Sequence, residues 1–216
     1  MTNPLETTDR PLDEKLGHLL SRLSLAMRAD SWDATAALGL NPTQGQILLL
    51  LYRRNAGLRL SEIAEELSVS SPTVSDSVTT LVEKEYVTKK RAVDDGRAIA
   101  VTLTAKGRKR VSKIEEKGDV VQVAIGALGS EEQLQLYRML IRILRELQVQ
   151  ERISTGRMCV TCRYFEPNRH QNASRPHHCS LVGAAFGDKT IRSDCPEHEV
   201  ASDETAEANW RRFSQT

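Results

Sequence analysis

Four cysteines in the last third of the chain offer the clearest chemistry. They are the only cysteines in the 216 residues and follow the spacing Cys159-x2-Cys162-x16-Cys179-x15-Cys195. Two cysteines two residues apart can hold a metal from a single turn, and two more from later loops can complete a tetrahedral site. The spacing predicts a metal centre, and histidines in the same segment are alternative ligands if one thiolate is not used: His177, His178 and His198.

The identity of the metal stays open between two main readings. The segment has few apolar residues and several prolines and glycines, so a metal is expected to staple it. Structural zinc, Zn2+, is the first expectation for thiolate ligands in a reducing compartment. Four thiolates also suit an iron-sulfur cluster. Reduced thiols, or a reversible disulfide, are the third reading.

The spacing of the cysteines resembles that of the high-potential iron-sulfur proteins. Those proteins also place an aromatic shortly after the first pair, as Tyr164 and Phe165 stand here. The sequence departs from them before the last cysteine, where Ser193-Asp194 replaces a glycine-aromatic pair, and its last spacing is longer.

A helix-turn-helix precedes this cluster in the chain. LSEIAEEL, from Leu60, has apolar residues on one helical face, and Ser68 to Ser70 make a turn. The next helix is expected to start with Ser71 as its cap and Pro72 at its first position. Its predicted buried stripe contains Val74, Val78, Leu81 and Val82.

The other face of the second helix is lined by short polar side chains. Such side chains can approach base edges in the major groove of double-stranded DNA. The candidate contacts are Ser71, Pro72, Thr73, Ser75, Asp76, Ser77 and Thr80.

Two alternating segments, VTKKRAV and AIAVTLT, predict a hairpin around Asp94-Asp95-Gly96-Arg97. From Lys84 to Arg110 the chain has nine Lys or Arg against three acids, although its total net charge is only +1. A basic patch beside a helix-turn-helix is typical of phosphate contacts. Lys89, Lys90 and Arg91 are the candidates for these contacts.

The order of elements, Asp95-x-Arg97 and Leu103-Thr104 at the end of the hairpin resemble the MarR family of winged-helix regulators. The resemblance extends over roughly residues 12 to 150 and implies a homodimer formed by the first helix and the last two. It also implies that Arg97 enters a minor groove and that Asp95 holds it in place. One departure is Asp76, where many relatives have arginine; a carboxylate can accept from a cytosine amino group.

The expected fold is mainly α with a small β wing: a winged helix-turn-helix dimer plus a small Cys-rich metal-binding module. The expected divisions are a disordered N-terminus (1–11), the winged-helix domain with dimerisation helices (12–152), the module (153–199) and a flexible tail (200–216). The longest apolar run, from Ile47 to Tyr52, is far too short for a membrane span. The N-terminus does not resemble a signal peptide, so a cytoplasmic protein is expected.

The leading hypothesis is a sequence-specific, homodimeric DNA-binding transcriptional regulator, most simply a repressor. Its Cys cluster either senses metal or redox state or only stabilises the dimer, and the sequence does not favour one. No enzyme is expected, because the Asp94-Asp95 pair lies at a hairpin tip with no partner nucleophile. The alternatives are an iron-sulfur electron-transfer protein that uses the winged helix only to dimerise, and a regulator responsive to a small molecule with a purely structural zinc site.

Overall fold

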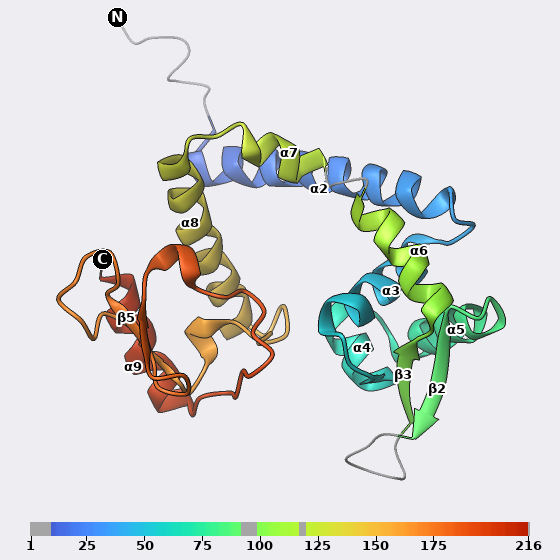
Figure 1. The fold of residues 1–216 in the computed structure, drawn as a ribbon. Helices are drawn as coiled ribbons and strands as arrows, with labels where there is room; N and C mark the ends of the chain where they lie inside the picture. Colours follow the sequence, from blue (N-terminus) through green and yellow to red (C-terminus); the bar gives the residue numbers. More distant parts are fainter. Residues whose placement is uncertain (1–9, 92–98, 117–119, 216) are drawn as a thin grey trace, which may run out of the picture. The chain divides into compact units, whose positions relative to one another are not determined.

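The computed structural model describes residues 10–91, 99–116 and 120–215. The protein consists of two compact units, Met1–Ala127 and Leu128–Thr216. The fold is mainly helical with two small antiparallel sheets, one in each unit (Figure 1). Of the expected disordered N-terminus, residues 1–9 lie outside the described residues.

The first unit contains a helix-turn-helix, a small sheet and additional helices. In chain order its elements are α2 (Leu12–Ala36), α3 (Pro42–Arg54), β1 (Leu58–Arg59), α4 (Leu60–Leu67), α5 (Ser71–Glu83), β2 (Val87–Arg91), β3 (Ile99–Leu103), α6 (Ala105–Glu116) and α7 (Val120–Gly126).

The turn between α4 and α5 is defined by two serines. Ser68 ends α4 in the left-handed region, at φ 52° and ψ 43°. Ser70 caps α5, and its side chain accepts a hydrogen bond from the Thr73 backbone N–H. The expected cap, Ser71, is therefore wrong by one residue: Ser71 is already helical and Pro72 follows it. Proline still costs nothing there, because the N–H groups of the first turn have no partner within the helix.

The helices of this unit pack around one aliphatic core. Its fully buried members include Ile47 and Leu48 from α3, Ile63 from α4, and Val74 and Val78 from α5. Val82, which the sequence placed on the buried stripe of α5, is instead 37% exposed. The core therefore fixes α5 by one narrow face and leaves the rest of that helix at the surface.

The sheet has the strand order β1-β3-β2, and β2 pairs antiparallel with β3 from Val87↔Leu103 to Arg91↔Ile99. Thr104 closes this hairpin: its hydroxyl donates to the Glu85 carbonyl oxygen at 2.7 Å and accepts from the Gly107 N–H at 2.9 Å. A Cβ on Gly107 would lie 2.0 Å from the Tyr86 carbonyl oxygen, so α6 needs glycine to pack against the start of the hairpin.

Helix α2 contributes almost nothing to that core. Of its residues only Thr35 is buried, and α7 lies beside it. Five of its apolar residues are 43–56% exposed: Leu16, Leu19, Leu20, Leu23 and Met27. The apolar stripe of α2 is therefore largely uncovered within this chain.

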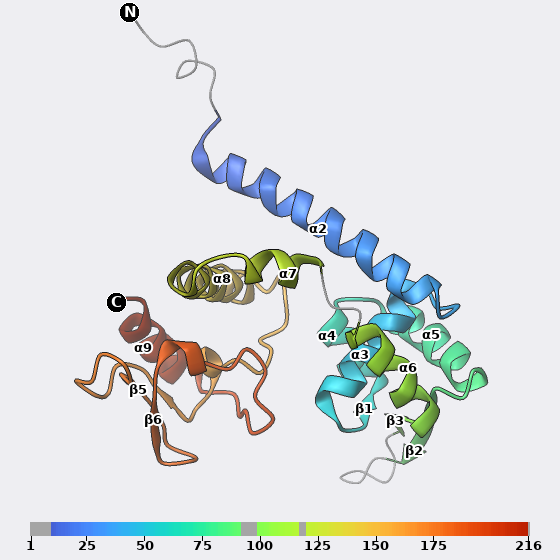
Figure 2. The same ribbon diagram turned by 45° about the horizontal axis from the view of Figure 1, so that its top comes forward.

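The second unit combines one long helix with short strands and loops (Figure 2). In chain order its elements are α8 (Ser130–Val149), η1 (Cys159–Thr161), β4 (Phe165–Glu166), β5 (His177–Cys179), β6 (Ala184–Phe186), η2 (Asp188–Thr190) and α9 (Asp203–Ser214). The strands form an antiparallel sheet in the order β4-β5-β6.

The core of the second unit joins α8 to the cysteine segment. Ile141 of α8 is 1% exposed and packs in one cluster with Phe165, Ile191 and Phe213. The Tyr137 hydroxyl donates to the Ile191 carbonyl oxygen at 2.8 Å. Helix α8 thus contributes its buried face to the small unit, which by itself has few apolar residues.

These contacts correct two expected boundaries. The division between the units falls after Ala127, whereas the sequence placed it after 152, because α8 shares a core with the cysteine segment. The expected flexible tail, 200–216, contains α9, whose Phe213 is 7% exposed. Its Asn209 side chain also donates to the Phe165 carbonyl oxygen, so the end of the chain is part of the second unit. None of the helices in the described ranges is long and apolar enough to span a bilayer.

Candidate functional site

The outer surface of α5 is a polar face at the start of a helix. Ser71, Pro72, Thr73 and Asp76 are exposed, while Ser75 and Thr80 are partly exposed. The Thr73 hydroxyl lies 2.7 Å from that of Ser70. Small polar groups at the N-terminal end of such a helix can approach base edges closely.

One candidate contact on α5 is wrong. Ser77 is 6% exposed, because it follows Val74 by three residues and precedes Leu81 by four, which places it on the buried stripe. Thr79 is exposed instead, and its hydroxyl donates to the Ser75 carbonyl oxygen at 2.9 Å. The sequence reasoning missed Thr79, although its spacing of three residues from Asp76 could have revealed it.

Basic side chains continue the surface onto β2 and α6. Lys89, Lys90 and Arg91 are all exposed. On α6, the Arg110 Nε donates to the Tyr86 hydroxyl at 3.1 Å, and Lys106 pairs with Glu85 at 2.7 Å. The charge expected from the sequence is therefore presented to solvent. The wing-tip residues Asp95 and Arg97 lie outside the described residues.

Comparisons with known proteins match this first unit. Residues 38–98 match the family model described as MarR family. The chain is 29% identical over 134 residues to an HTH-type transcriptional repressor of Mycobacterium tuberculosis, over 61% of this chain and 94% of the relative. The similarity supports a MarR-family winged-helix transcriptional regulator.

Solved structures agree with the MarR-like fold. Staphylococcus aureus MepR in its complex with DNA is 26% identical, with a TM-score of 0.52 over 62% of this chain and 98% of that chain. MepR in its DNA-binding conformation gives 26% identity and a TM-score of 0.54 over 62% and 98%. A MarR transcriptional regulator of Methanosarcina mazei shares the fold at 22% identity, with a TM-score of 0.53 over 63% and 99%.

A second candidate site accompanies the MarR-like unit, in the unit formed by residues 128–216. All four cysteines line one cavity of about 290 Å³. They come from separate places in the chain: Cys159 and Cys162 from either side of η1, Cys179 from the end of β5, and Cys195 from the loop after η2. All four are free thiols. The fold therefore brings the expected ligand set together.

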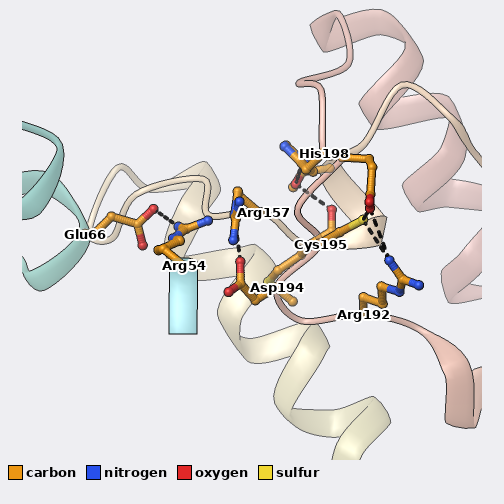
Figure 3. Close-up of polar contacts among 10 residues, drawn as sticks. Arg54, Glu66, Arg157, Arg192, Asp194, Cys195 and His198 are labelled. Carbon is orange, nitrogen blue, oxygen red and sulfur yellow. Dashed lines mark hydrogen bonds and ion pairs between the residues drawn. The ribbon is translucent and has the colours of Figure 1, made fainter. Parts of the chain in front are cut away.

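Two groups of Arg192 contact the sulfurs. Its backbone N–H donates to the Cys159 Sγ at 3.2 Å, and its guanidinium donates to the Cys195 Sγ at 3.5 Å (Figure 3). The loop that carries Cys195 is fixed by an ion pair between Arg157 and Asp194 at 2.7 Å (Figure 3). Burial raises the pKa of the Cys159 thiol, the N–H of Arg192 opposes this, and the other three thiols raise it further.

The three histidines offered as alternative ligands lie elsewhere. The His177 Nδ1 accepts from the Asn168 N–H at 3.2 Å and its Nε2 lies 2.5 Å from the Asp188 carboxylate. His178 lies against His170, and the His198 Nε2 is 3.0 Å from the Thr161 hydroxyl. None of the three is among the residues that line the cavity.

His177 has a structural role instead. It is 1% exposed and its ring packs against Phe165, Phe186 and Phe213. Burial by itself would raise the pKa of the Asp188 carboxyl, but hydrogen bonds from His177 and Arg138 hold that pKa below its usual value. This buried pair links β5 to η2 and, through Arg138, to α8.

The cavity also contains residues that the spacing of cysteines could not identify. Its wall includes Arg192, Glu197, Leu181, Val182 and Phe186. The only sequence signal for them was proximity to a cysteine. Within the described part of the chain, no three His, Cys, Asp or Glu side chains are grouped so that they could hold a metal ion.

Proposed function

We propose that the protein is a sequence-specific DNA-binding transcriptional regulator, most simply a repressor. The observation that carries this proposal is the polar outer face of α5 beside the exposed lysines of β2. The similarity to a mycobacterial repressor and to MepR, which was solved in complex with DNA, supports it.

In this proposal α5 enters the major groove. Thr73 and Asp76 are exposed near its N-terminal end, where side chains of a recognition helix reach base edges. Asp76 would accept from a cytosine amino group, at some cost in overall affinity because a carboxylate repels phosphate. Lys89, Lys90 and Arg91 would contact phosphates. Asp95 and Arg97 keep the minor-groove role that the family resemblance implies.

We propose further that the protein acts as a homodimer. Each helix-turn-helix reads one half-site, and a second copy lets the protein read a pseudo-palindrome. The uncovered leucines of α2 are the candidate interface, together with the exposed Met139 and Ile143 of α8. Leu23→Lys should lower the dimer fraction in light scattering, while Leu181→Lys, an equally exposed leucine of the second unit, should not.

The test of DNA binding is selection of genomic fragments by the purified full-length protein, followed by titration of the enriched site. Enrichment of a pseudo-palindrome that competes strongly against random DNA is expected. Asp76→Ala should reduce that discrimination, and Arg97→Ala should weaken binding to the site. Failure to enrich any sequence, or unchanged affinity of both variants, would contradict the proposal.

Regulation by metal or redox state is a further part of the proposed function. Its support is that the four thiols lie in one cavity within the same unit as α8. The titration of the enriched DNA site should then differ between protein with and without its bound metal. Equal affinity would leave the cysteine module with a stabilising role only.

A further inference from the structure

We propose that the four-cysteine cavity binds an iron-sulfur cluster rather than a single zinc ion. Its ligands are Cys159, Cys162, Cys179 and Cys195, which all line the same cavity. Each thiol loses its proton to solvent and each sulfur then binds iron. The cluster site is independent of the DNA-binding surface, so either proposal can fail alone.

The volume between the thiols favours a polynuclear cluster. A tetrahedral zinc ion, with Zn–S bonds of about 2.3 Å, brings its sulfurs to about 3.8 Å from one another and leaves no space among them. Here a cavity of about 290 Å³ lies among the four cysteines. The described residues also contain no group of three ligand side chains placed around one ion. The sulfurs therefore surround a space rather than a point.

The donor set is purely thiolate. No histidine lines the cavity, and the ring nitrogens of His177 already contact Asn168 and Asp188. Zinc sites of mixed Cys and His ligands would use those rings, whereas clusters use thiolates almost alone. The one carboxylate in the wall, Glu197, is engaged with the Arg192 guanidinium at 3.3 Å.

The wall of the cavity has the polarity expected for a cluster. Apart from the sulfurs and the Arg192–Glu197 pair, it is built mainly from Tyr164, Phe165, Leu181, Val182 and Phe186. An apolar wall limits the access of water to a cluster. The backbone N–H of Arg192, at 3.2 Å from the Cys159 sulfur, is the type of donor that stabilises the negative charge of a cluster's sulfurs.

Fixed neighbours hold the cysteine loops in position. The Cys162 N–H donates to the Cys159 carbonyl oxygen at 2.9 Å, and the Cys195 N–H donates to the Arg157 carbonyl oxygen at 2.9 Å. Cys179 is paired with Phe165 and Ala184 in the small sheet. The four sulfurs are thus presented by backbone that is hydrogen-bonded within the unit, and the cluster does not have to order them from loose chain.

The experiment is metal analysis and absorption spectroscopy of the full-length protein purified without oxygen. We expect iron and acid-labile sulfide in equal amounts and a broad absorption near about 400 nm. Protein that is colourless with stoichiometric zinc would overturn the proposal. So would thiols that take up neither iron nor sulfide when supplied with ferrous iron and sulfide under anaerobic conditions.

Two variants test the site itself. Cys195→Ser should lose most of the iron, because serine is a poor cluster ligand, while His178→Ala, which changes a side chain outside the cavity, should keep it. Equal iron in the two variants would contradict the assignment. Should Cys195→Ser fail to fold, iron-edge X-ray absorption of the wild type decides: iron–sulfur and iron–iron distances support the cluster, and iron bound only by oxygen and nitrogen overturns it.

Discussion

The hydroxyl of Tyr137 donates a hydrogen bond to the carbonyl oxygen of Ile191, 2.8 Å away. Tyr137 belongs to α8, and Ile191 directly precedes Arg192, whose N–H and guanidinium contact two of the four thiols. The bond therefore connects the long helix of the second unit to the wall of the cavity. Ile141, one turn further along α8, is buried in the same core as Cys162.

Iron loading should consequently slow hydrogen exchange in the middle of α8. A cluster fixes the loops on which Tyr137 and Ile141 pack, so local opening of the helix costs more free energy. The measurement is hydrogen exchange by mass spectrometry on protein with and without iron. Tyr137→Phe should reduce the difference, since it removes the bond to Ile191, which contributes about 1 kcal/mol. Identical exchange of α8 in both states would show that the helix does not respond to the site.

Charge beside the thiols should set the reduction potential of the bound cluster. Arg192→Ala removes a positive charge 3.5 Å from the Cys195 sulfur and should lower the midpoint potential by on the order of tens of millivolts. Glu197→Gln removes a negative charge and should raise the potential. Anaerobic redox titration measures both, and shifts of the same sign would rule out an electrostatic origin.

Substitution of Gly107 should destabilise the winged-helix unit. In Gly107→Ala the new Cβ meets the Tyr86 carbonyl oxygen at 2.0 Å, so the helix or the hairpin must move, at a cost of about 1–3 kcal/mol or more. Gly17→Ala, with nothing within 4 Å, is the matched control and should add roughly 0.5–1 kcal/mol through helix propensity. Urea unfolding of each variant tests the pair, and equal stabilities would show that the contact relaxes freely.

The lysines of β2 should account for part of the salt dependence of DNA binding. Lys90→Ala should weaken binding to all sequences alike and reduce the slope of log K against log salt by about 1 for one lost phosphate contact. Lys189→Ala, an exposed lysine of the second unit, removes the same charge and should leave the slope unchanged. The two titrations share one DNA fragment, and a slope altered only by the Lys189 variant would place the contacts elsewhere.

The sequence alone determined the local elements and the identity of the thiols. The spacing of apolar residues predicted α4 and α5, the alternation after Lys84 predicted β2 and β3, and the cysteine spacing predicted that four thiols act together. These features depend on neighbours along the chain, through helical or strand periodicity and turn residues, and such signals are written in consecutive residues.

The tertiary structure decided which surfaces are available and what the thiols surround. Ser77 is polar yet buried, and Thr79 is exposed, because the packing of α5 on its neighbours selects one narrow face of the helix. Helix α8 joined the cysteine segment, and α9 closed that unit, because two apolar-poor pieces bury enough surface only together. His177 became part of a core and the four cysteines came to line one cavity. Those outcomes depend on contacts between residues far apart in the chain, which no local pattern encodes.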